Sequence, residues 1–177
     1  MRIKNTYSRY GFVTIGFHWM MAVLIIGMLS LGLYMISLPK GPYKFFLYGW
    51  HKQIGAVILI LSLVRLFWRV INITPTLALP LWEKFTALAV HWGFYGLMIA
   101  MPLSGWLMTN ASGRSVSFFK LFDLPILMSK NDFLNDLFGN IHEYLAYLFI
   151  AAIILHTIAA LKHHYVDKDD ILKRMLR

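Results

Sequence analysis

Long apolar segments alternate with short polar ones along this chain of 177 residues. Four of the apolar segments can each cross a bilayer as a helix, because its hydrocarbon core requires about 20 helical residues. Most charged residues fall between these segments, where helices are expected to end. We therefore predict an all-α integral membrane four-helix bundle, a single domain over residues 1–177, with spans at about 12–36, 48–70, 84–109 and 140–162.

The connecting segments carry turn residues and interfacial aromatic residues. Residues 41–50 (GPYKFFLYGW) are typical of a turn and an aromatic belt at the membrane surface, and two prolines break the helical pattern within residues 72–80. Residues 110–139 are mixed in composition and predict a polar loop, with a short interfacial helix around 131–138. The basic start resembles a secretory signal, but the first apolar run is too long for one, so we predict an uncleaved helix.

Composition supports a membrane protein and gives its orientation. The chain is 59% hydrophobic and only 14% charged, with a formal net charge of +9. The basic residues lie between the apolar runs rather than on one face, which argues against nucleic-acid binding. On the predicted topology, eleven of the 17 Lys and Arg residues lie on the side of the two termini. This bias predicts cytoplasmic termini. The six on the opposite side are Lys40, Lys44, Lys52, Arg114, Lys120 and Lys130.

Histidines are the candidate cofactor ligands. The chain has no cysteine, which excludes thiolate metal sites, iron–sulfur clusters and covalent haem attachment. His142 and His156 are fourteen residues apart in the fourth span. At 3.6 residues per turn they share one helix face, about 21 Å apart along the axis. One helix can therefore supply one ligand to each of two stacked sites.

His18 and His51 match these two histidines in depth. His18 lies about 12 Å, and His156 about 9 Å, from the cytoplasmic end of its span. His51 and His142 both lie near the opposite end of their spans. Two opposed imidazoles at one depth can be the axial ligands of a b-type haem. We therefore predict two haems, one held by His18 and His156 and the other by His51 and His142.

Further polar residues in or near the spans have two interpretations each. Arg65 could bind a haem propionate, whereas Arg69 is expected chiefly to anchor the helix at the cytoplasmic surface. Glu143 follows His142 and could orient it. Three further histidines, His91, His163 and His164, could form a quinone or proton-exchange site. For His163 and His164, an interfacial, solvated position is the simpler interpretation.

Several motifs together resemble the bacterial cytochrome b561 family over nearly the full chain. They are FHW (17–19), WHKQIG (50–55), RLFWR (65–69), MPLSGWLM (101–108), IHE (141–143) and LHTIAALKHHYVDKDDILKRM (155–175). The resemblance implies a di-haem protein of the bacterial inner membrane, related to the cytochrome b subunits of hydrogenases and formate dehydrogenases. The family's four haem-ligand histidines fall on His18, His51, His142 and His156.

The resemblance further implies electron transfer between ubiquinone and a periplasmic donor or a partner subunit, and some members are thought to oxidise superoxide. Two alternatives stay open at this point. The chain could be the membrane subunit of a larger dehydrogenase or hydrogenase, which conducts electrons without chemistry of its own. It could also be a histidine-lined metal or proton transporter, although such a transporter is expected to carry carboxylates in its spans, where only Glu143 qualifies.

Overall fold

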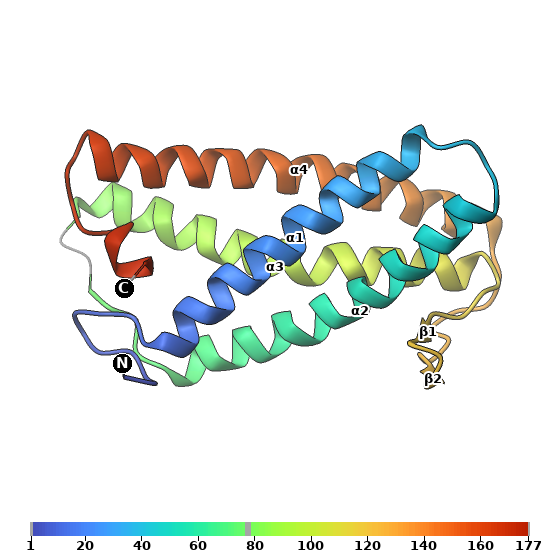
Figure 1. Cartoon of the computed structure of the whole chain (residues 1–177), viewed down its shortest axis with the longest axis horizontal. Helices are drawn as coiled ribbons and strands as arrows, with labels where there is room; N and C mark the ends of the chain where they lie inside the picture. The colour runs from blue at the N-terminus through green and yellow to red at the C-terminus, as the bar shows by residue number, and fades with distance from the viewer. Residues whose placement is uncertain (1, 77–78, 177) are drawn as a thin grey trace.

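Four long helices make up most of the computed structural model, which describes residues 2–76 and 79–176. Each helix is apolar and long enough to cross a membrane. Helix α3 packs against α2 and α4, and α1 packs against α2 while crossing the bundle obliquely (Figure 1). These features confirm the predicted all-α membrane four-helix bundle. The helices are α1 (Phe12–Ser37), α2 (Pro42–Ile71), α3 (Leu81–Ala111) and α4 (Asp132–Tyr165).

The two ends of the bundle differ. Both chain termini lie at one end, which we call the terminal end (Figure 1). The α1–α2 and α3–α4 connections lie at the other, which we call the hairpin end because it carries the antiparallel strands β1 (Ser117–Phe118) and β2 (Phe122–Asp123). An even number of spans returns the chain to the side on which it began.

Three helices begin earlier than the sequence pattern predicts, α3 by only a few residues. Helix α2 begins at Pro42, where proline's fixed φ suits the first helical position and its missing N–H costs no hydrogen bond. The aromatic residues expected in a turn are therefore helical. Helix α4 begins at Asp132, because the side chain of Asn131 accepts a hydrogen bond of 3.0 Å from the Leu134 amide and caps the helix. The short helix expected around 131–138 is thus the start of α4.

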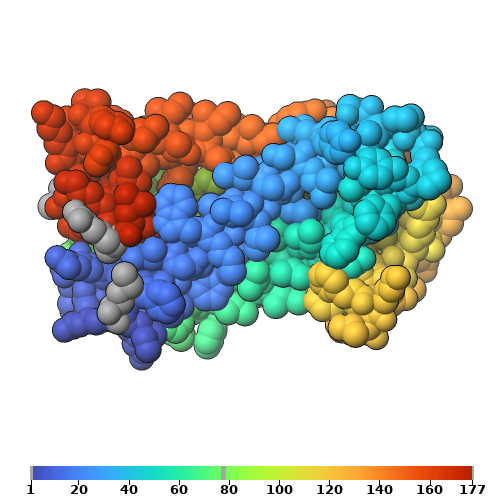
Figure 2. Space-filling view, in the orientation of Figure 1, coloured from blue at the N-terminus to red at the C-terminus, as the bar shows by residue number. Residues whose placement is uncertain are grey.

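Polar side chains tie the connecting segments to the bundle. At the hairpin end, Asn110 is 1% exposed, accepts a bond from the Leu127 amide at 2.9 Å and donates to the Arg114 carbonyl at 3.0 Å. At the terminal end, the Trp19 indole donates to the Met175 carbonyl at 2.7 Å. The C-terminal segment, which contains the 3₁₀ helix η1 (Lys173–Met175), therefore lies against the first turns of α1, next to the N-terminal part of the chain in Figure 2.

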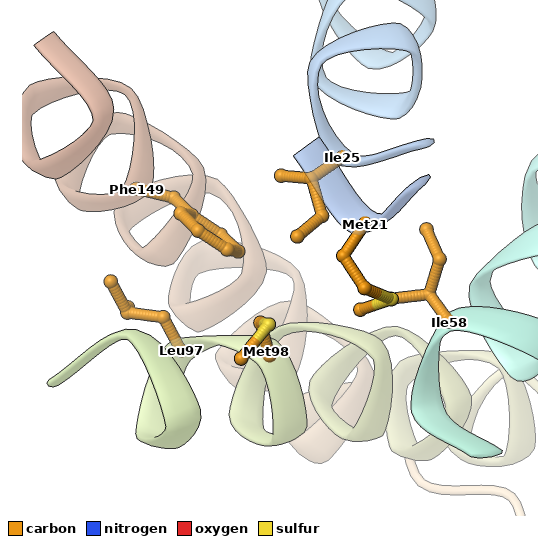
Figure 3. Close-up of a cluster of buried hydrophobic side chains, with 6 residues drawn as sticks. All are labelled: Met21, Ile25, Ile58, Leu97, Met98 and Phe149. Carbon is orange, nitrogen blue, oxygen red and sulfur yellow. The ribbon is translucent and has the colours of Figure 1, made fainter. Parts of the chain in front are cut away.

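A buried apolar layer lies in the middle of the bundle and is contributed by all four helices (Figure 3). Phe149 in this layer is seven residues from both His142 and His156, so it lies about 10 Å along α4 from each. The layer therefore separates the two depths at which the histidines occur. Its members are Met21, Ile25, Ile58, Leu97, Met98 and Phe149.

Candidate functional site

The structure brings four histidines together as two pairs at opposite ends of the bundle. His18 from α1 and His156 from α4 have ring centroids 6.1 Å apart, and we call them the terminal-end pair. His51 from α2 and His142 from α4 also have ring centroids 6.1 Å apart, and we call them the hairpin-end pair. These are the two pairs that matching by depth predicts, and α4 contributes one member to each.

The spacing within each pair suits a metal ion held between two imidazoles. An imidazole nitrogen binds a transition metal at about 2.0–2.1 Å, and it lies roughly 1.1 Å from its own ring centre. Two imidazoles on opposite sides of one metal ion therefore have centroids roughly 6 Å apart. Both pairs have this spacing. Because the chain has no cysteine, imidazole is the strong metal ligand that it offers at these positions.

Hydrogen bonding around the hairpin-end pair is also consistent with haem ligation. The Nδ1 atom of His51 is buried without a hydrogen-bond partner among the residues that the structure describes. The Nδ1 atom of His142 lies 3.0 Å from the Met101 carbonyl oxygen. Because a carbonyl only accepts, this nitrogen carries the proton and the Nε2 lone pair is free for a metal. The residues present therefore fit a bis-histidine haem.

An apolar groove of about 230 Å³ lies between α1 and α4, the helices that carry the terminal-end pair. Apolar surroundings are what a porphyrin macrocycle requires, and they also influence the potential of its iron. The groove extends away from the terminal-end pair toward the hairpin end. Its lining consists of Ile26, Leu29, Ser30, Leu33, Ile150, Ile153 and Ile154.

Two further candidates gather at the terminal-end pair. An Arg65 guanidinium nitrogen lies 3.5 Å from Nδ1 of His18, and the guanidinium also lies over the Tyr95 ring at 5.7 Å from its centroid. Within the described ranges, this half-buried cation has no carboxylate partner, so it is available to an anionic group. The ring of His91 lies 6.3 Å from that of His156, centroid to centroid. Arg65 and His91 therefore both lie beside the terminal-end pair.

The remaining candidates lie nearer the surface of the terminal end. Burial raises the pKa of Tyr10, and the positive charge of Arg69 opposes this shift. His163 contacts the C-terminal segment, with Nδ1 at 2.7 Å from an Asp169 carboxylate oxygen and 3.2 Å from one of Asp167. Both carboxylates are partly exposed, so they connect His163 with the surface, and the sequence alone did not reveal these contacts.

His164 differs from its neighbour His163. Its Nδ1 atom is buried and has no hydrogen-bond partner within residues 2–76 and 79–176. Its ring packs edge-on against that of Tyr165, with centroids 4.8 Å apart. It is therefore less solvated than the sequence predicts.

The expectation that Glu143 orients His142 is wrong. Glu143 is exposed and accepts a hydrogen bond from the Tyr147 hydroxyl at 3.1 Å. Consecutive helical residues point about 100° apart, so Glu143 is directed away from the face that His142 uses. The groups that contact the His142 imidazole come instead from Met101 and Ser104 on α3.

A cationic pocket at the hairpin end was also missed by sequence reasoning. It measures about 350 Å³ and is lined by Phe45, Tyr48, Gly49, Lys52 and Arg114. Lys52 directly follows His51 in the sequence, which was an available signal. Arg114 lies 62 residues later in the sequence, and only the folded chain brings it to the same pocket.

Comparisons with known proteins identify the family. The sequence profile described as prokaryotic cytochrome b561 matches residues 9–177. Cytochrome b561 homolog 2 of Escherichia coli K12 is 37% identical over 99% of this chain and 95% of its own length. A Yersinia pestis protein named "Probable superoxide oxidase CybB" is 31% identical, over 96% of this chain and 97% of that protein. Cytochrome b561 homolog 1 of E. coli K12 is 32% identical over 78% of this chain and 80% of its own length.

The matches cover the four membrane helices and both histidine pairs. They favour electron transfer over the transporter alternative, because this family binds b-type haem in the membrane. The chain therefore belongs to the prokaryotic cytochrome b561 family of multi-pass, haem-binding electron-transfer proteins of the bacterial membrane.

Proposed function

We propose that this protein binds two b-type haems and passes electrons through them from a periplasmic donor to ubiquinone. His18 and His156 would be the axial ligands of one haem, and His51 and His142 those of the other. The observation that carries this proposal is that α4 supplies one histidine to each of two pairs with the same 6.1 Å centroid spacing. When bound, each haem supplies a carrier that accepts and releases one electron.

Charge distribution supports a cytoplasmic terminal end. Six of the 17 Lys and Arg residues are at the hairpin end and ten are at the terminal end, while Arg177 lies outside the described residues. Positively charged residues favour the cytoplasmic side. The hairpin-end pair would then lie near the periplasm and the terminal-end pair near the cytoplasm.

The cationic pocket at the hairpin end supports an anionic donor, and we propose superoxide. Lys52 and Arg114 line the pocket and would attract a small anion toward the adjacent His51. Each superoxide would give up one electron and leave as O₂. The similarity to the Yersinia protein whose name refers to superoxide oxidation supports the same donor.

The polar groups at the terminal end support ubiquinone as the acceptor. Ubiquinone needs two electrons, here from two superoxide anions, and two protons to become ubiquinol. His163 can supply a proton because an imidazole is a common general acid, and its Nδ1 atom contacts the partly exposed carboxylates of Asp167 and Asp169. Arg65 and His91 lie beside the terminal-end pair and would contact the quinone headgroup or a haem propionate.

The ligand assignment is tested by single alanine substitutions and by haem content of the purified protein. His18→Ala and His156→Ala are expected to remove the same haem, and His51→Ala and His142→Ala the other one. His163→Ala is the matched control and should retain both haems. If His18→Ala removed the haem that is lost in His142→Ala, the proposed pairing would be wrong.

The donor assignment is tested by the rate at which superoxide reduces the haems. Arg114→Gln is expected to slow this reduction severalfold at low salt, and less at high salt, because charge steering is screened. Lys40→Gln removes a cation from the same end but outside the pocket and should have little effect. Co-purification of a soluble subunit that donates electrons, with no reduction by superoxide, would instead support the subunit alternative.

A further inference from the structure

His142 is held against the backbone of α3 by contacts that the other three paired histidines lack within the described residues. Its Nδ1 atom lies 3.0 Å from the Met101 carbonyl oxygen and 3.0 Å from the Ser104 hydroxyl oxygen. The Ser104 hydroxyl itself donates to the Met101 carbonyl at 2.7 Å. Since the serine proton is used in that bond, the hydrogen bond between Ser104 and His142 must be donated by the Nδ1–H of His142 to the serine oxygen.

Gly105 makes this approach possible. A Cβ atom at this position would lie 3.0 Å from Cε1 and 3.3 Å from Nδ1 of His142, so an alanine would require the ring to shift by a few tenths of an ångström. Gly105 is one helical turn beyond Met101, so both face the same histidine. Gly93 and Gly96 on the same helix have open space around them, with no atom within 4 Å of an added Cβ.

We propose that Met101, Ser104 and Gly105 form a positioning site that fixes the tautomer of His142 and lowers the reduction potential of the haem at the hairpin-end pair. This inference rests on the proposed function. A histidine that donates its second N–H to a carbonyl is a more basic metal ligand, and a more basic ligand stabilises ferric over ferrous iron.

Charges at the two ends do not cancel this effect. Arg65 is half-buried beside His18, and its positive charge favours the reduced state at the terminal-end pair. At the hairpin end, the half-buried Lys52 and the exposed Arg114 would act in the same direction on the other haem, so the cations at the two ends oppose each other's effect on the difference in potential. The contact of His142 with the Met101 carbonyl then makes the hairpin-end haem the stronger reductant, which favours electron movement toward the terminal end.

The test measures the potentials of both haems by redox titration of the intact, haem-loaded protein. The hairpin-end haem is the one lost in His51→Ala. In Gly105→Ala, its ferrous-to-ferric ratio at a fixed solution potential should rise about tenfold, equivalent to about 59 mV for one electron. Its low-spin ferric electron paramagnetic resonance signal should shift as well. Gly96→Ala adds the same methyl group to the same helix in open space and should change neither haem.

Ser104→Ala provides a second variant with a milder perturbation. It removes one of the two oxygens near Nδ1 and leaves the Met101 carbonyl, so the same haem should shift in the same direction by less. If Gly105→Ala lost both haems, the Ser104→Ala result alone would decide. Unchanged potentials in the loaded variants, or a shift confined to the terminal-end haem, would overturn the positioning role. Wild-type protein without a haem at the hairpin-end pair would contradict the proposed function itself.

Discussion

At the scale of single residues, the two ends of the protein provide different polar chemistry. The terminal end combines a half-buried guanidinium, Arg65, with His91 and with a histidine that contacts two carboxylates, His163. The hairpin end combines the pocket cations Lys52 and Arg114 with a histidine fixed to a backbone carbonyl. This difference suits an anion that gives up electrons at one end and a quinone that takes up protons at the other.

His163→Ala is expected to slow quinone-dependent reoxidation of the haems about tenfold or more, because a positioned general acid contributes at least this much. His91→Ala should slow it too if His91 contacts the headgroup. Both variants should keep the two haem spectra of the wild type, measured by reduced-minus-oxidised difference spectroscopy. Lys168→Gln alters an exposed residue of the same segment and serves as the control. Unchanged quinone kinetics in both histidine variants would exclude this site.

At the scale of secondary-structure elements, the apolar layer holds the four helices at the separation that the histidine pairs require. Phe149 is 3% exposed and packs against Phe94 with ring centroids 5.9 Å apart. Phe94 in turn contacts the ring of His156, with centroids 5.3 Å apart. The packed middle of the bundle therefore contacts one candidate haem ligand, His156, through Phe94.

Phe149→Ala is expected to lower the free energy of unfolding by about 3 kcal/mol, because removing a buried aromatic ring leaves a cavity. Leu148→Ala, at the neighbouring position, removes a side chain that is 56% exposed on the lipid-facing surface and should cost much less. Denaturation in detergent, followed by circular dichroism, compares the two variants. Equal losses of stability would show that the layer is not the packed core.

At the scale of the whole molecule, the even number of spans places both termini on one side, and contacts of the C-terminal segment with α1 and with the α2–α3 connection close that end. The Trp19 indole reaches the Met175 carbonyl, and Arg174 donates to the Thr76 carbonyl at 3.0 Å. Trp19 directly follows His18 in the sequence. The C-terminal segment therefore lies close to the terminal-end pair.

The proposed orientation is tested by single cysteines, because the natural chain has none. In intact cells with a permeable outer membrane, a membrane-impermeant maleimide should label Lys120→Cys at the hairpin end and leave Lys168→Cys at the terminal end unlabelled. A fluorescent reporter fused after Arg177 should also fold and fluoresce in the cytoplasm. Labelling of Lys168→Cys in place of Lys120→Cys would invert the assignment of the two sides.

The number and class of helices follow from the sequence alone, because apolar runs of this length have few alternatives in a bilayer. The pairing of histidines also follows from the sequence, since a fourteen-residue spacing fixes both face and depth on a helix. The first residues of α2 and α4 were predicted less well from the sequence. Pro42 and Asn131 start these helices through local backbone geometry, which the hydrophobic pattern does not encode.

Only the tertiary structure decided which groups from other helices contact each histidine. Arg114 reaches the pocket beside His51, and Met101 reaches His142, through the packing of segments far apart in the sequence. Glu143, although adjacent to His142 in the sequence, turns away from its ring because successive helical residues point in different directions. The sequence by itself determines periodicity along one helix, whereas the contacts between helices depend on how they pack in three dimensions.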